Sequence, residues 1–153
     1  MGRNGDNKTI EVCSLGLGQR ENYPLADEQN LLLVFDVSTI PFPKEQFSRT
    51  DGSDGNALLW LHRWSCEKGC TSFMHYRAII QDYVLCALMT NEKKKTLIVC
   101  FVGEDGRYAS VAAACLIGNW IKSFFPQLKY KVKVIVRHLG LEKEEAMALA
   151  ETA

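Results

Sequence analysis

Residues 31–35 form an unbroken run of five apolar side chains, LLLVF, and residues 96–102 form a second segment of the same kind. Both are far shorter than the ~20 residues needed to cross a membrane. Short apolar runs of this length are typical of strands buried on both faces of a parallel sheet. Residues 71–90 lie between them and carry apolar side chains at helical spacing. This alternation predicts an α/β protein with a largely parallel sheet and helices packed on its faces.

The remaining segments complete this prediction. Residues 8–15 and 129–137 are expected to form two more strands, and residues 56–64 and 108–125 two more helices. Pro41 and Pro43 are expected to exclude regular structure where they occur, and Pro126 to end the last helix. No repeat, linker or second core is evident. We therefore predict a single domain over residues 1–153, with residues 1–7 and 142–153 loose or peripheral.

Composition narrows the classes of function. Lys and Arg total 18, as do Asp and Glu, so the net charge is zero. This balance argues against a protein that binds nucleic acid by bulk charge. The first residues are polar and lack the apolar core of a secretory signal, so we expect a cytoplasmic protein with no membrane contact. We expect no cofactor.

A glycine loop connects the second apolar run to the helix expected at residues 108–125. Gly103 and Gly106 allow a close approach of the backbone, and the helix start offers unpaired N–H groups to an anion. Arg107 and Ser110 add side-chain donors. In parallel sheets, ligands bind beyond the carboxyl ends of the strands, which is where this loop is expected. Strand–glycine–helix loops are also common in α/β proteins without a ligand, and Glu104 and Asp105 would repel a phosphate.

The last predicted strand offers two further groups of candidates. Arg137 and His138 come at its end, where they would join the glycine loop; a surface pair without function is the alternative. Lys129, Lys131 and Lys133 alternate with apolar residues. These lysines are candidates for RNA binding, although such alternation is also typical of a solvated edge strand.

A metal site is a separate hypothesis. Within fourteen residues the chain has four side chains of the types that bind zinc: His62, Cys66, Cys70 and His75. The order matches no standard zinc finger, and no CxxC pair is present. The alternative is a junction between two helices with incidental polar residues.

An enzyme is the main functional alternative. Cys100 is followed by glycine and arginine, as in the Cys-x5-Arg loop of cysteine phosphatases. The interval from Cys100 to Arg107 is one residue too long for that loop, and Val99 replaces its usual histidine. The apolar flank favours a buried, unreactive thiol.

The order of the segments resembles the C-terminal domain of the bacterial RNase adapter protein RapZ family along most of the chain. That family has SFGFKYG-x-P-x-DAD, FDVRFLPNP, a TG-x-D turn, IGCTGGxHRSV and RHRxL, in this order. The corresponding stretches here are residues 14–17 (SLGL, with Pro24 and Asp27), 35–43 (FDVSTIPFP), 50–54 (TDGSD), 99–103 (VCFVG) with 108–111 (YASV), and 137–141 (RHLGL).

The resemblance implies a domain that binds an amino-sugar phosphate, takes part in small-RNA recognition and oligomerises. It does not imply nucleotide hydrolysis, because no Walker A loop is present. Three departures change the expected pocket: Ser38 stands in place of the arginine of FDVR, and Tyr108 and Ala109 in place of the His-Arg of HRSV. Arg107 would substitute for one lost guanidinium.

Together these observations predict a non-catalytic domain that binds a phosphorylated small molecule or an RNA phosphate. The resemblance alone implies a homo-oligomer, and the residues leave the oligomeric state open. The ligand-binding candidates are Gly103, Gly106, Arg107, Ser110, Arg137, His138 and Ser38. The alternatives are an enzyme with Cys100 as nucleophile and an interaction protein whose pocket has decayed.

Overall fold

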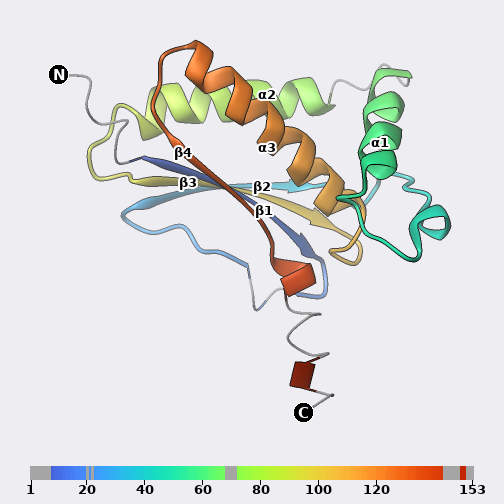
Figure 1. Cartoon of the computed structure of the whole chain (residues 1–153). Helices are drawn as coiled ribbons and strands as arrows, with labels where there is room; N and C mark the ends of the chain where they lie inside the picture. Colours follow the sequence, from blue (N-terminus) through green and yellow to red (C-terminus); the bar gives the residue numbers. More distant parts are fainter. Residues whose placement is uncertain (1–7, 20, 22, 68–71, 143–148, 151–153) are drawn as a thin grey trace.

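A computed structural model describes residues 8–19, 21, 23–67, 72–142 and 149–150. Its centre is a four-stranded sheet in the order β2-β3-β1-β4, with every neighbouring pair parallel. The strands are β1 (Thr9–Gly16), β2 (Asn30–Asp36), β3 (Thr96–Gly103) and β4 (Lys133–His138). The predicted α/β class and parallel sheet are confirmed. Because all four strands run the same way, their carboxyl ends meet at one edge of the sheet (Figure 1).

The two inner strands, β1 and β3, carry most of the buried sheet residues. They pair from Thr9 with Thr96 to Gly16 with Gly103. The prediction that residues 31–35 are buried on both faces is wrong. They form β2, which lies at an edge of the sheet, and Val34 is 50% exposed. A strand at an edge has a neighbouring strand on one side only. On the face of β2 that carries Val34, no described helix covers the strand.

The helices α1 (Gly55–Glu67), α2 (Ser72–Tyr83) and α3 (Ala109–Gln127) lie on one side of the sheet. There α2 and α3 lie over its face and α1 packs against α3 beyond the carboxyl ends of the strands, and the segment between β1 and β2 runs along the other face (Figure 1). α3 is the most buried of them and crosses the inner strands with Val111, Ile117 and Ile121 fully buried. On the opposite face, a smaller apolar cluster around Cys13 and Cys100 is covered by Tyr23 and Leu139, among others.

Three helical details differ from the sequence prediction. The helix expected at residues 71–90 is α helix only to Tyr83, and a π-helical turn, η4 (Val84–Leu88), follows it. Pro126 lies inside the last turn of α3 instead of ending the helix. A 3-10 helix, η3 (Lys44–Phe47), follows Pro43, although the prolines were expected to exclude regular structure. Proline suits the start of a helix, since its missing N–H would have no partner there.

The strand expected at residues 129–137 begins only at Lys133, so Lys129 and Lys131 lie before it. Lys129 has a φ of 64°, and the N–H groups of Lys129 and Tyr130 donate to the last turn of α3. A left-handed residue of this kind commonly ends a helix. The neighbouring strand also explains why β4 begins at Lys133, because β1 begins at Thr9, and Thr9 pairs with Lys133.

After β4, residues 139–142 form a helical turn. Residues 1–7 and most of 142–153, which were expected to be loose or peripheral, lie outside the described residues. Within the described part of the chain, no helix is both long and apolar enough to span a bilayer.

Candidate functional site

The glycine loop lies at the carboxyl edge of the sheet, as predicted. β3 ends at Gly103, and α3 begins at Ala109 after the N-cap residue Tyr108. Tyr108 makes no side-chain capping hydrogen bond, so no side-chain cap there competes with a ligand. The first N–H groups of a helix have no partner within the helix, and the helix dipole adds partial positive charge there. The start of α3 can therefore attract an anion.

Ser110 lies in the first turn of α3 and has an unusual environment. Its side chain is 0% exposed, and its hydroxyl has no hydrogen-bond partner among the described residues. A β-carbon on Gly103 would lie 3.2 Å from Ser110 Oγ, so the hydroxyl sits directly against the end of β3. A buried hydroxyl without a partner costs about 1–3 kcal/mol. Buried polar groups without a partner are rare in folded proteins, and each needs an explanation. A bound ligand that accepts a hydrogen bond from the hydroxyl is such an explanation.

Arg107 is held beside this turn by the loop at residues 50–54. Its Nε donates to the carbonyl oxygen of Thr50 at 3.0 Å, and its guanidinium lies 5.8 Å from the centre of the Tyr108 ring. The backbone also joins the two segments, because the Gly52 N–H donates to the Arg107 carbonyl at 2.8 Å. These contacts fix the cation close to the start of α3.

Lys44 offsets part of the negative charge of the loop. Its Nζ lies 2.8 Å from Glu104 Oε2 and 3.1 Å from Asp105 Oδ2. The two carboxylates, Glu104 first, raise the pKa of Lys44. All three side chains are exposed, so the interaction is weak in water. Lys44 also lines a cavity of about 290 Å³ formed by residues 42–46.

Gly106 adopts a φ of 73°, which favours glycine. A β-carbon there would lie 2.6 Å from the backbone nitrogen of Gly16 and 2.7 Å from Gln19 Oε1. Gln19 Oε1 in turn accepts a hydrogen bond from the Gly16 N–H at 2.7 Å. The close backbone approach expected at this glycine is therefore made by the end of β1.

His138 forms a cluster with two residues that the sequence did not indicate. Its Nδ1 lies 2.9 Å from Ser14 Oγ, and its Nε2 lies 3.5 Å from Cys115 Sγ on α3. Burial lowers the pKa of His138, opposed in part by the charge of Asp51. Burial also raises the pKa of Cys115, again with a contribution from Asp51. Both shifts favour the neutral imidazole and the neutral thiol at pH 7.

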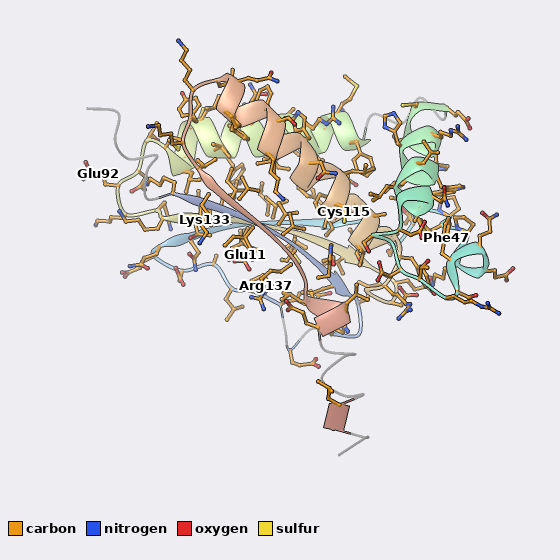
Figure 2. All side chains as sticks on the ribbon, in the orientation of Figure 1. Glu11, Phe47, Glu92, Cys115, Lys133 and Arg137 are labelled. Carbon is orange, nitrogen blue, oxygen red and sulfur yellow. The ribbon has the colours of Figure 1, made fainter. Side chains whose placement is uncertain are left out.

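Arg137 is adjacent to His138 in sequence, but its side chain is on the other face of the sheet (Figure 2). Its Nη2 lies 2.9 Å from Glu142 Oε2, and its Nη1 lies 3.6 Å from Glu11 Oε1. Glu142, and then Glu11, raise its pKa. Successive side chains of a strand point to opposite faces, so the structure does not bring Arg137 together with His138 or with the loop on the helix face.

Ser38 follows β2 at the same edge of the sheet. Its backbone N–H donates to Asp36 Oδ1 at 2.8 Å. A side-chain hydrogen bond from Ser38 is the largest cause of a lowered pKa of Asp36. The contacts of Ser38 are thus made with Asp36 and not with the glycine loop.

The metal hypothesis is only partly within the described chain. His62 Nε2 and Cys66 Sγ lie 3.9 Å apart on α1, and His75 is exposed on α2. Cys70 lies outside the described residues. Among the described residues, no group of three potential ligands could hold a metal ion. The four-residue site stays a prediction.

Cys100 lies on the face of β3 away from α3. It is 0% exposed and pairs in register with Cys13, which is also buried. The hydrogen bond with Cys100, together with burial, raises the pKa of Cys13. Neither sulfur is in a position to meet a ligand at the start of α3.

The three lysines gather away from the loop, before and at the start of β4. Lys129, Lys131 and Lys133 line a surface cavity of about 620 Å³ with Pro126, Tyr130 and Val132. No ion pair joins them to a carboxylate of the described residues.

No protein-family model matches the chain, and no match was found among the curated proteins.

The sequence prediction thus names the loop, Arg107, Ser110 and His138, all of which lie at or near the carboxyl edge of the sheet, but not the residues that contact them. Ser14, Cys115, Lys44 and Gln19 are far from the loop in sequence or lie within apolar segments. Only the parallel register and the packing of α3 bring them to this edge.

Proposed function

We propose that this protein binds a small phosphorylated molecule, without catalysis, at the first turn of α3. The observation that carries the proposal is the fully buried Ser110 hydroxyl, which has no hydrogen-bond partner among the described residues. A phosphate oxygen would accept a hydrogen bond from it. The N–H groups at the start of α3 would supply further donors.

Arg107 would supply the positive charge. A hydrogen bond between a guanidinium and a phosphate contributes about 1.5–3 kcal/mol. The rest of the ligand would extend toward Lys44 and the cavity at residues 42–46, because Lys44 contacts the loop through Glu104 and Asp105. Because Ser110 is closed off from solvent, binding requires a small displacement of the loop at residues 103–108.

Binding is favoured over catalysis by the position of the thiols. Cys100, the nucleophile of the phosphatase alternative, is fully buried on the far face of β3. Cys115 is closer to the carboxyl edge, but its raised pKa leaves it as a thiol. A thiol is a poor nucleophile compared with a thiolate.

The test is a thermal-shift and calorimetric titration with inorganic phosphate, sugar phosphates and nucleotides. A ligand at about 100 times its Kd adds about 2.7 kcal/mol of stability. We expect one of these compounds to raise the Tm of the wild type. Ser110→Ala and Arg107→Gln should each weaken binding about tenfold, equivalent to about 1.4 kcal/mol.

Arg63→Gln is the matched control, because Arg63 is an exposed arginine on α1. It should bind like the wild type. Equal binding by Arg107→Gln and the wild type would contradict the proposed site. No shift with any compound would favour the interaction protein with a decayed pocket.

A further inference from the structure

β4 leaves one edge of the sheet open. Within the described residues it pairs with β1 alone. The Lys133 N–H donates to the Lys8 carbonyl at 3.0 Å, toward β1. In a parallel ladder, alternate residues direct their backbone groups to the same neighbour. The N–H and C=O groups of Val134 and Val136 therefore point away from β1, to the open side.

This open side is accessible along the strand. Lys133 and Arg137 are exposed, and the three residues between them are half-buried. α3 packs on the face of β4 and not along its edge, since a β-carbon on Gly118 would lie 2.6 Å from Val136 Cγ2. The outward backbone groups can thus accept another strand.

The start of β4 adjoins a cavity whose lining has a distinct chemistry. The cavity of about 620 Å³ has apolar walls from Pro126, Tyr130 and Val132. Its charged groups are Lys129, Lys131 and Lys133, with no carboxylate in the lining. A cavity of this size can hold a side chain of a bound segment, and the lysines favour an acidic one.

The positive charges along β4 argue against a second copy of this chain as the strand that pairs with the open edge. Pairing β4 with another β4 would bring Lys133 and Arg137 close to the same cations of the second copy. Like charges on neighbouring strands destabilise the pairing. An acidic partner meets no such repulsion.

We propose that the open edge of β4, together with residues 129–132, binds an extended acidic segment of a partner protein as an added strand. Backbone hydrogen bonds to Val134 and Val136 align the segment. Its carboxylates contact Lys131 and Lys133, and an apolar side chain enters the cavity beside Tyr130. Strand addition to a sheet edge is an established mode of peptide recognition. This surface shares no residue with the proposed phosphate site, and neither proposal depends on the other.

Lysines at an edge strand also have a simpler role, because they prevent edge-to-edge aggregation. The two roles differ in what they predict. Lysines that only prevent aggregation would repel other strands and bind none. A binding surface would instead have affinity for an acidic strand of matching length.

The experiment uses the full chain and a fluorescent peptide, Ac-Glu-Val-Glu-Val-Glu-Val-Glu-amide, with fluorescence anisotropy as the readout. We expect saturable binding to the wild type. Lys131→Gln/Lys133→Gln should weaken it about tenfold. Lys93→Gln/Lys95→Gln removes the same charge from exposed lysines between η4 and β3 and should leave binding unchanged.

A second peptide tests strand pairing. It has the same sequence with alternate backbone nitrogens methylated, which removes donors on one edge while keeping every charge. It should bind at least about tenfold more weakly. In NMR spectra of the wild type, the unmodified peptide should shift the Val134 and Val136 amides most strongly.

Three results would overturn the proposal. If Lys131→Gln/Lys133→Gln and Lys93→Gln/Lys95→Gln weakened peptide binding equally, the binding would be a non-specific effect of charge. Equal affinity for the methylated peptide would exclude strand addition. Binding of oligouridylate without binding of the peptide would make the occupant a nucleic acid.

Discussion

Ser14 and His138 pair in register on the neighbouring parallel strands β1 and β4, and Ser14 Oγ lies 2.9 Å from His138 Nδ1. The other imidazole nitrogen lies 3.5 Å from Cys115 Sγ on α3. The imidazole of β4 is thus contacted on its two nitrogens by side chains from two other elements, β1 and α3. Protonation of His138 would place a charge in this half-buried cluster.

The first prediction concerns pH. Burial lowers the pKa of His138 in the folded protein below its unfolded value, which is about 6.5. The unfolded chain then binds more protons in this range, so the free energy of unfolding should fall as the pH drops from about 7 through about 6.5 toward the lower folded pKa. Urea unfolding at a series of pH values measures this. His138→Gln should flatten the dependence, and His75→Gln, at an exposed site, should not.

The second prediction concerns the loop that holds Arg107. A β-carbon on Gly52 would lie 2.0 Å from the carbonyl oxygen of Tyr108, which is backbone and cannot move aside like a side chain. Gly52→Ala should therefore destabilise the protein by about 3 kcal/mol. Gly55→Ala is the control, because nothing lies within 4 Å of its β-carbon position. Similar Tm values for the two variants would show that the loop does not pack on α3.

A third prediction concerns thiol reactivity. Cys66 and Cys86 are exposed, whereas Cys13 and Cys100 are buried under Tyr23 and Leu139. Labelling of the folded protein with iodoacetamide, located by mass spectrometry, should modify Cys66 and Cys86 first. Cys13 and Cys100 should react only as the protein unfolds. Early modification of Cys100 would instead show that this thiol is accessible and would support the alternative of an enzyme with Cys100 as nucleophile.

The fourth prediction concerns Lys8, which is 1% exposed. Its Nζ donates to the carbonyl oxygens of Asn91, at 2.7 Å, and Lys94. Lys8→Met keeps the aliphatic chain but leaves two carbonyls without this donor. We expect a loss of about 1–3 kcal/mol in the free energy of unfolding, measured by urea denaturation. Lys93→Met, at an exposed position, should change stability by less than about 0.5 kcal/mol.

Much of the fold could be predicted because apolar pattern and helical period are local properties. Residues 96–102 and 108–125 were placed almost to their ends, since each pattern is long and has a clear boundary. The start of β4 was misplaced because alternation continues back to Lys129, while pairing can begin only where β1 offers a partner. β2 was expected to be buried on both faces because its composition does not reveal its position at the edge of the sheet.

The candidate site could be predicted only in part for the same reason. Gly103, Arg107 and Ser110 belong to one continuous loop and helix start, so spacing alone located them. Arg137 and His138 were expected to act together, but strand alternation sends them to opposite faces. Cys115 lies within an apolar helix, and nothing in its own neighbourhood indicates that it faces His138.

The strand order has a consequence for how this chain reaches its folded state. β1 is the first strand in the sequence but lies inside the sheet, between β3 and β4. It has no neighbour to pair with until β3 is available, near residue 96, and it gains its second only with β4. Contacts between such distant segments slow folding, and an apolar strand that waits for its partner is exposed to aggregation. During synthesis, β1 is thus enclosed on both sides only when β4, the last of the four described strands, has been made.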